Sequence, residues 1–244
     1  PMTRRTDMRT PTSTPMTTDL SATGLLKLAT WLSPSFPIGA FAYSHGLEYA
    51  VEAGFADDRA KLEEWGRYLL AHGPVRQDAV LLARAWREVE DPAALTETAV
   101  IAAALKGTPE LAQETLVQGA AFLRTVRAAW AHPALDRVAT DLTPIGIALP
   151  VAVGAATAVH GVPLRETLQI YLHAFVANLT SSAMRLSVIG QTDGQRILAA
   201  LEGAVLEAAE SALAAAPDDL GAASAMIDWC SMRHETQHTR LFRS

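Results

Sequence analysis

The sequence of 244 residues contains little of two residue types: it has one cysteine, Cys230, and three lysines among 20 basic residues. A single cysteine excludes an internal disulfide, which is typical of the reducing cytoplasm, and we expect the protein there. The other basic residues are arginines, which suit planar ion pairs at protein interfaces better than lysines do. The net charge is -6. Since the positive footprint of nucleic-acid-binding proteins is missing, we expect protein partners and no nucleic acid.

Uninterrupted apolar segments are also missing. The two most apolar stretches are residues 145–159 and 170–189, but Pro150 breaks the first and Arg185 lies in the second. A membrane-spanning helix needs about 20 predominantly apolar residues in a row. We therefore expect no membrane span.

The first 20 residues contain no apolar run and are rich in threonine and proline. A secretory signal needs an apolar core, so this segment does not predict secretion. We interpret residues 1–20 as a disordered tail, within which Met8 or Met16 is a candidate for the true first residue.

Strand patterns are absent, because no stretch of four or more residues alternates between apolar and polar side chains. Helix signals are frequent instead. Asp58, Asp91 and Thr108 each precede an apolar pattern with helical spacing, and proline directly follows the last two. No serine- or glycine-rich linker divides the chain. The sequence therefore predicts an all-α fold, a single globular bundle of about ten helices over residues 21–244.

The longest helical pattern covers residues 163–189. Its apolar positions step by three and four residues, and Ala174, Ala177 and Ser181 beside them are small enough for another helix to approach closely. Asp193 follows as the candidate cap of the next helix.

An unusual segment covers residues 33–48. Pro34 and Pro37 restrict its backbone and remove two N–H donors, while Gly39 permits a turn that other residues resist. Ser44 is a candidate cap for the helix that follows. From composition alone, a plain loop between helices is as good an interpretation of this segment as a functional one.

Residues 190–195 read Gly-Gln-Thr-Asp-Gly-Gln, with two glycines near the start of a helix, where phosphate can bind. A P-loop also needs a lysine and a hydroxyl residue after its second glycine, and neither follows Gly194. We therefore expect no binding of GTP or ATP by a P-loop. A tight turn capped by Asp193 is the simpler interpretation.

Residues 234–238 read His-Glu-Thr-Gln-His, which matches the H-E-x-x-H pattern of zinc peptidases. On a helix, His234 and His238 would share a face and could hold zinc, with Glu235 polarising a water molecule. The residues that follow contain no third ligand. A zinc-dependent hydrolase is therefore the alternative hypothesis, beside a solvated terminal segment and a helical scaffold of an unrelated complex.

Together, these three segments resemble the UreF family of urease accessory proteins. The matching residues are Ser33, Pro34, Pro37, Gly39, Tyr43, Ser44, His45, Gly46, Leu47 and Glu48, then Arg185, Leu186 and residues 190–195, then His234, Glu235, Gln237 and residues 240–244. Each motif alone is weak, but three in this order and with helices between them are specific. The resemblance covers residues 25–244.

The resemblance implies an all-α, homodimeric, cytoplasmic protein without catalysis or a cofactor of its own. Members of the family bind the accessory protein UreD, also called UreH, and recruit the GTPase UreG. The resulting complex delivers nickel to apo-urease, driven by GTP hydrolysis in UreG. The UreF-like member is the adaptor, with a suggested part in regulating the GTPase.

On this resemblance, the first and third segments bind a partner. The expected partner-binding residues are Ser33, Pro34, Phe36, Pro37, Gly39, Tyr43, Ser44, Gly46, Glu48, Arg240, Leu241, Phe242, Arg243 and Ser244. We expect residues 240–244 to become ordered when the UreD-like partner binds, because an aromatic residue beside arginines is typical of interface hot spots. The expected dimer interface on the longest helix comprises Leu172, Phe175, Leu179 and Arg185.

A route for nickel needs groups that bind the metal weakly. Amide oxygens do so, and imidazole suits nickel. The expected residues of this route are Gln191, Gln195, His234 and His238, and no tightly bound metal is expected.

Overall fold

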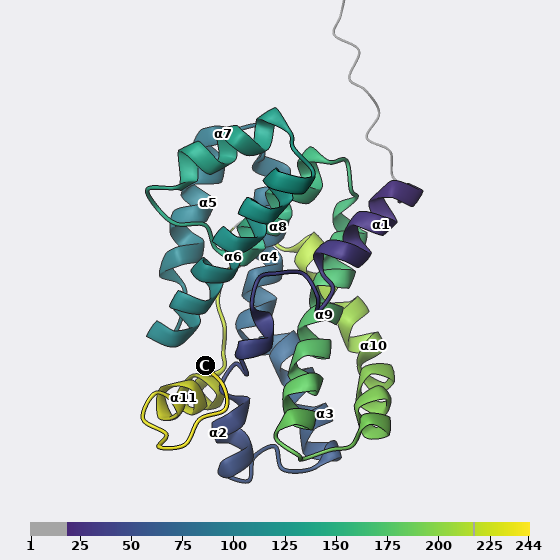
Figure 1. Ribbon diagram of the computed structural model, residues 1–244, viewed down its shortest axis with the longest axis vertical. Helices are drawn as coiled ribbons and strands as arrows, with labels where there is room; N and C mark the ends of the chain where they lie inside the picture. Colours follow the sequence, from purple (N-terminus) through teal and green to yellow (C-terminus); the bar gives the residue numbers. More distant parts are fainter. Residues whose placement is uncertain (1–18, 217) are drawn as a thin grey trace, which may run out of the picture.

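The computed structural model describes residues 19–216 and 218–244 (Figure 1). These residues form eleven α-helices and one short 3-10 helix, and no β-strand occurs among them, so the predicted all-α fold is confirmed. The elements are α1 (Ala22–Trp31), η1 (Ala40–Ala42), α2 (Leu47–Glu52), α3 (Arg59–His72), α4 (Pro74–Glu88), α5 (Pro92–Ala104), α6 (Pro109–Ala129), α7 (Pro133–Leu142), α8 (Leu149–Val159), α9 (Leu164–Arg185), α10 (Gln191–Ala214) and α11 (Ala225–His234). Residues 1–18 of the expected tail, with Met8 and Met16, lie outside the described residues.

Local sequence signals determine several helix starts. The carboxylate of Asp58 accepts a hydrogen bond from the third N–H of α3 (2.9 Å), and Asp91 and Thr108 cap α5 and α6 in a similar way. The expectation for Asp193 is wrong: α10 begins at Gln191, so Asp193 lies in its first turn. A negative side chain still favours the helix there, because the N-terminal end carries a partial positive charge.

Helix α8 lies at the centre of the bundle, packed against α4 and α6. It has no charged side chain, and residues 150–157 are all buried. Two glycines let its neighbours approach. A Cβ on Gly154 would lie 2.4 Å from the carbonyl oxygen of Leu82, and a Cβ on Gly119 would lie 2.1 Å from that of Ile147. A helix that is apolar on every side is stable only when other elements cover it.

The apolar stripe of α9 faces the protein's own core. Leu172 is fully buried and Leu179 is 3% exposed, so neither side chain can contact a second copy. The predicted dimer interface is wrong at these two positions, because burial inside one chain satisfies the same periodic pattern. Phe175 and Arg185 are partly exposed, and their part in a dimer stays a prediction. The helix ends sooner than expected, and Ser187 beyond it takes a left-handed φ of 62°.

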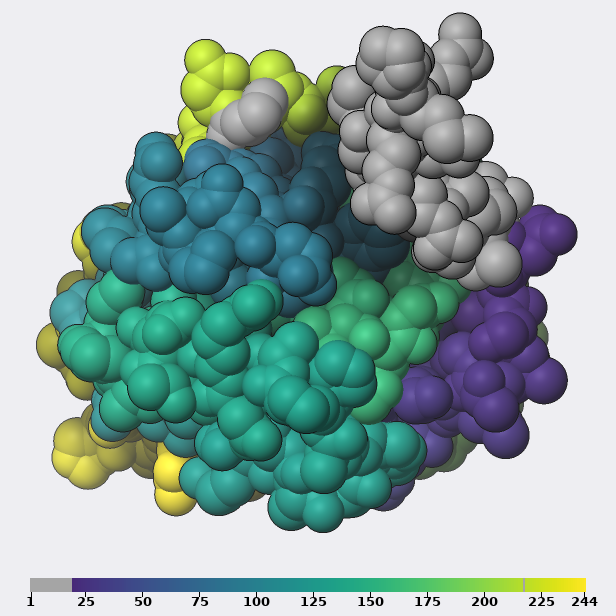
Figure 2. Space-filling model, turned by 90° about the horizontal axis from the view of Figure 1, so that it is seen from above, coloured from purple at the N-terminus to yellow at the C-terminus, as the bar shows by residue number. Residues whose placement is uncertain are grey.

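In Figure 1, α5, α6 and α7 form one end of the molecule, while α2, α3 and α11 lie towards the other. Viewed onto the first end in Figure 2, the segment from α5 to α7 covers much of the surface, and α1 lies at its edge. The chain returns at its C-terminus to lie beside α2, α11 and the near end of α6. Among the described helices, none is long and apolar enough to cross a membrane.

Candidate functional site

The C-terminal segment, residues 240–244, packs against the body of the protein. Phe242 is 4% exposed and Ser244 is fully buried, whereas Leu241 is 61% exposed. The chain alone supplies the contacts of this segment. The structure therefore packs this segment without a partner, and its ordering when the UreD-like partner binds stays a prediction.

The turn before α2 places Glu48 beneath this segment. His45 and Gly46 both take left-handed backbone conformations, with φ of 55° and 77°. A Cβ on Gly46 would lie 3.0 Å from the backbone nitrogen of Ser231 in α11, so glycine lets the two helices approach. Ser44, the expected cap, accepts from the N–H of Glu48 (3.3 Å), but the residue that directly precedes the helix is Gly46.

Glu48 is a buried carboxylate that binds its own chain. One oxygen accepts a hydrogen bond from the backbone N–H of Leu241 (2.7 Å), and the other accepts from that of Phe242 (2.9 Å). The second oxygen also lies 3.1 Å from Nε2 of His234. Hydrogen bonds to an ionised acceptor are roughly twice as strong as neutral ones. Glu48 therefore fixes the C-terminal segment, and the expectation that its side chain faces a partner is wrong.

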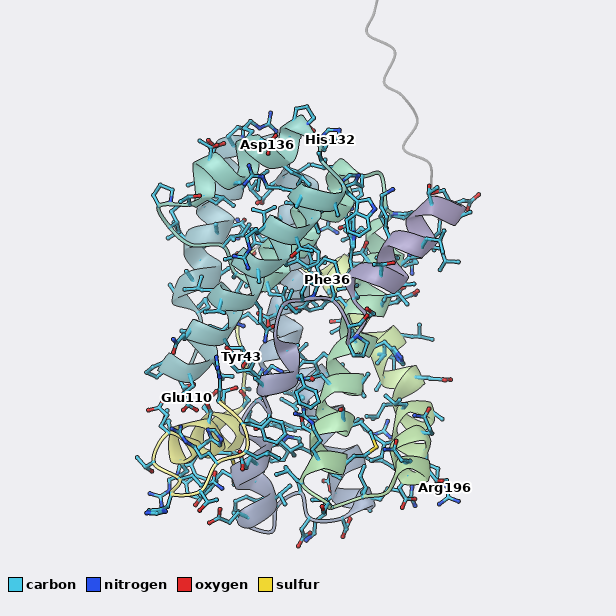
Figure 3. The ribbon with its side chains drawn as sticks, in the orientation of Figure 1. Phe36, Tyr43, Glu110, His132, Asp136 and Arg196 are labelled. Atoms are coloured by element: carbon cyan, nitrogen blue, oxygen red, sulfur yellow. The ribbon has the colours of Figure 1, made fainter. Side chains whose placement is uncertain are left out.

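His234 is fully buried between two carboxylates. Its Nδ1 lies 2.8 Å from Glu110, on the opposite side of the ring from Glu48. The other oxygen of Glu110 accepts a hydrogen bond from Arg240 (2.8 Å). Figure 3 shows Glu110 at the start of α6 beside the C-terminal segment. The tautomer of His234 determines which ring nitrogen donates to which carboxylate.

The zinc-hydrolase alternative does not fit this geometry. Helix α11 ends at His234, so the exposed His238 lies beyond it and the two imidazoles share no helical face. Both nitrogens of His234 already contact carboxylates. Within residues 19–216 and 218–244, no group of three or more His, Cys, Asp or Glu side chains is arranged to hold a metal ion. The H-E-x-x-H segment therefore lacks the helical arrangement on which the zinc-hydrolase alternative depends.

The last residue is held by α6 and by the turn before α2. The backbone N–H and the hydroxyl of Ser44 both donate to the main-chain oxygen of Ser244 (2.8 and 2.5 Å). The hydroxyl of Ser244 donates to Glu114 (2.8 Å), whose other oxygen accepts from Gln118 (2.9 Å). Sequence analysis missed Glu110 and Glu114, because two carboxylates one turn apart resemble an ordinary solvated helix face.

Arg185, at the end of α9, connects the first segment to the third. The carbon of its guanidinium lies 3.7 Å from the ring centre of Phe41 and 4.3 Å from that of Phe242. Burial lowers the pKa of Arg185 from its ordinary value, and cation–π attraction to the two rings offsets part of this desolvation. Phe41 is itself 66% exposed, so it and Leu241 present apolar side chains to solvent.

The structure divides the expected partner-binding residues into two groups. The buried ones are Phe36, Tyr43, Ser44, Gly46, Glu48, Phe242 and Ser244. For these the expected contact with a partner is wrong, because they pack within the chain, as the ring of Phe36 does against Phe122 at 5.3 Å between centres. The exposed or partly exposed ones are Ser33, Pro34, Pro37, Gly39, Arg240, Leu241 and Arg243, and for them the contact stays a prediction.

The four residues expected to line a nickel route do not lie together. Gln191 and Gln195 are exposed at the start of α10, close to Arg196, whereas His234 is buried at the end of α11. Figure 1 shows these two helices on opposite sides of the molecule. The described residues of the expected route therefore form no common site, and a part for any of them in nickel transfer stays a prediction.

Comparison with known proteins gives a consistent result. The family model described as UreF matches residues 56–202, more than half of the chain. Urease accessory protein UreF of Rhodopseudomonas palustris (strain HaA2) is 50% identical over 235 residues, which cover 96% of this chain and 98% of that protein. Proteins of the same name from Agrobacterium fabrum and Rhizobium leguminosarum bv. viciae are each 48% identical over 229 residues, which cover 94% of this chain and 100% of theirs. The chain therefore belongs to the UreF family of urease accessory proteins.

Proposed function

We propose that this urease accessory protein is an assembly adaptor. It binds a UreD/UreH-like protein and the GTPase UreG in one complex, and that complex delivers nickel to apo-urease. Nickel is the cargo of the complex, GTP binds to UreG, and contact with the adaptor regulates GTP hydrolysis. The protein acts in the cytoplasm as a homodimer.

The observation that carries this proposal is the fixed C-terminal segment. The carboxylate of Glu48 accepts hydrogen bonds from its backbone and the hydroxyl of Ser44 donates one to it, yet Leu241 within it is 61% exposed. An apolar side chain on a backbone that is already ordered loses little conformational entropy when a partner covers it.

The surroundings of Leu241 have the chemistry of a protein interface. Arg240 and Arg243 flank this side chain, and Phe41, also exposed, stacks on Arg185. Arginine and aromatic residues are enriched among the residues that dominate binding energy. We therefore assign the UreD-like partner to the surface formed by Phe41, Leu241 and the two flanking arginines.

The homodimer uses a different face. Leu172 and Leu179 lie in the core, so the contact between copies falls on the partly exposed side of α9, which includes Phe175.

The proposal is tested by light scattering on mixtures of the full chain with the UreD-like and UreG-like proteins of its own organism. Leu241→Ser is compared with Leu26→Ser, which removes a side chain of similar exposure, 66%, from α1. We expect Leu241→Ser to weaken binding of the UreD-like protein at least tenfold and Leu26→Ser to leave it unchanged. Equal binding by the two variants would contradict the assigned surface, and no complex with the wild-type chain would contradict the adaptor.

A further inference from the structure

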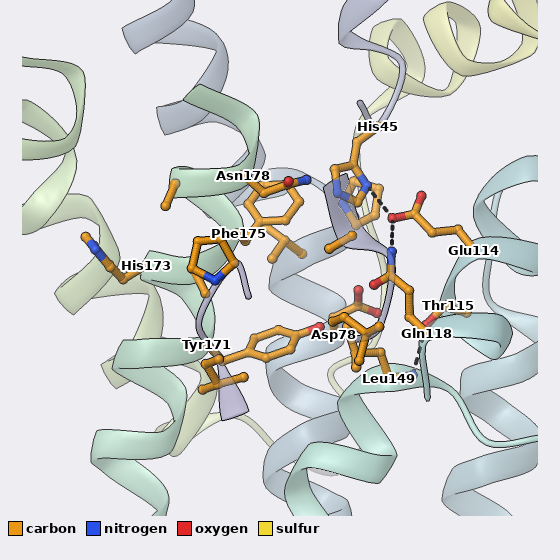
Figure 4. A pocket seen from close by; sticks show the side chains of 18 of the residues that line it. His45, Asp78, Glu114, Thr115, Gln118, Leu149, Tyr171, His173, Phe175 and Asn178 are labelled. Carbon is orange, nitrogen blue, oxygen red and sulfur yellow. Dashed lines mark hydrogen bonds and ion pairs between the residues drawn. The ribbon is translucent and has the colours of Figure 1, made fainter. Parts of the chain in front are cut away.

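A cavity of about 430 Å³ lies between α4, α6, α9 and the segment from Trp31 to His45. Its volume is within the range of small-molecule sites in proteins, about 300–1,000 Å³. Most of its wall is apolar, with contributions from Trp31, Ile38, Leu111 and Ile170. One part of the wall is polar, and Figure 4 shows side chains from three helices converging there.

Two nearly buried polar side chains that line the cavity each have an oxygen without a hydrogen-bond partner among the described residues. Tyr171, on α9, is 8% exposed, and its hydroxyl makes no hydrogen bond to any residue that the structure describes. Gln118, on α6, is 4% exposed and donates its amide N–H to Glu114 (2.9 Å). Because the carboxylate of Glu114 accepts, this bond fixes the orientation of the amide and leaves the carbonyl oxygen of Gln118 for the cavity.

The third polar group of this wall is the carboxylate of Asp78, on α4. One of its oxygens accepts from Lys106 (2.6 Å), and the other has no partner among the described residues. Figure 4 shows the hydroxyl of Tyr171 directed towards this carboxylate. Burial first, and then the charges of Asp78 and Glu114, raise the pKa of Tyr171 well above its ordinary value. The wall therefore offers acceptor oxygens beside two carboxylates, one of which is paired with Lys106.

We propose that this cavity is a binding site for a compact amphipathic amine. The ammonium group donates to the free oxygens of Gln118, Asp78 and Tyr171, and the apolar body packs against the remaining wall. A primary ammonium has three donors and no acceptor, which matches three available oxygens. A carboxylate ligand would instead be repelled by the carboxylates of Asp78 and Glu114, and the ammonium group of Lys106 in the wall is already paired with Asp78.

The site is also connected to the C-terminal segment. Glu114 holds Gln118 with one oxygen and the hydroxyl of Ser244 with the other. An amine bound to the carbonyl oxygen of Gln118 therefore holds the amide that orients Glu114, and Glu114 in turn accepts the hydrogen bond from Ser244. Ligand binding is therefore coupled, through Gln118 and Glu114, to the segment that the proposed adaptor presents to its partner.

The test uses three probes that share one apolar body: 4-phenylbutylamine, 4-phenyl-1-butanol and 4-phenylbutanoate. Binding of each to the full chain at pH 7 is measured by isothermal titration calorimetry. We expect the amine to bind at least tenfold more tightly than the alcohol, and the carboxylate not to bind. No binding of the amine, or equal binding of amine and carboxylate, would overturn the proposal and leave a cavity filled with water.

Two variants locate the site. Gln118→Leu removes the carbonyl acceptor, and Gln113→Leu on the exposed side of the same helix is its matched control. Tyr171→Phe breaks no hydrogen bond within the described protein, so it tests the site even if Gln118→Leu fails to fold. We expect Gln118→Leu and Tyr171→Phe each to weaken binding of the amine about tenfold and Gln113→Leu to leave it unchanged. Unchanged affinity in Tyr171→Phe would place the amine elsewhere and refute the assignment.

Discussion

Replacing Glu48 by glutamine removes the charge that anchors the C-terminal segment while keeping the size of the side chain. The two oxygens of Glu48 accept hydrogen bonds from the N–H groups of Leu241 and Phe242 and from His234. Glutamine has one acceptor oxygen, and its amide N–H₂ would face a donor at the position of the other.

The magnitude follows from these contacts. A hydrogen bond to a charged group contributes about 1.5–3 kcal/mol, and Glu48→Gln loses at least one and weakens the others. We expect the free energy of docking the C-terminal segment to fall by about 3 kcal/mol, since the site is buried and poorly screened. The population of the open segment then rises by roughly two orders of magnitude, because 1.4 kcal/mol corresponds to a factor of ten.

Hydrogen exchange measures this opening directly. The amides of Leu241 and Phe242 should exchange roughly a hundredfold faster in Glu48→Gln, while amides of the central helix α8 keep their protection. Glu97→Gln, at an exposed position on α5, is the matched control and should change neither. Unaltered exchange at residues 241 and 242 in Glu48→Gln would refute the claim that Glu48 holds the segment.

Further predictions concern the single thiol, two glycines and the ionisation of Asp228. Burial raises the pKa of the Cys230 thiol to about 11, so at pH 8 the folded protein should react with Ellman's reagent about a hundredfold more slowly than the urea-unfolded chain; equal rates would contradict its burial. Gly119→Ala should destabilise the protein by about 2–3 kcal/mol or more in urea unfolding, because its Cβ would collide with the carbonyl of Ile147. Gly203→Ala in α10 is the control: its Cβ meets nothing within 4 Å, so it should stabilise the protein by up to about 1 kcal/mol. Burial also raises the pKa of Asp228, so the folded protein loses stability as pH rises from the unfolded pKa of this group towards its folded pKa. Asp228→Asn should therefore be more stable than wild type at pH 7 but not at pH 3. A gain that is the same at both pH values would show that charge is not the cause.

Features that depend on a few neighbouring residues were predictable from the sequence. Asp58, Asp91 and Thr108 cap their helices as expected, because a capping side chain bonds to backbone groups two or three residues away. The absence of strand patterns correctly indicated an all-α fold. Asp193 shows the limit of this reasoning, since an acidic residue favours both the cap and the first turn of a helix.

Features that depend on distant residues were not predictable. The bond between Glu48 and the N–H of Leu241 joins positions 193 residues apart, and nothing in either segment indicates the other. The stripe containing Leu172 was correctly read as apolar, but periodicity does not distinguish the core of one chain from an interface between two. The polar wall of the cavity likewise exists only because three helices bring Asp78, Gln118 and Tyr171 together.

The most direct test of the adaptor is reconstitution of nickel insertion. Apo-urease is incubated with nickel, GTP and the UreD-like and UreG-like proteins, with and without this chain, and nickel bound to urease is measured by mass spectrometry after gel filtration. The adaptor hypothesis predicts that urease is loaded with stoichiometric nickel in the presence of the wild-type chain. It predicts only background nickel in urease without the chain and with Leu241→Ser. Equal nickel loading with and without the chain would contradict the account.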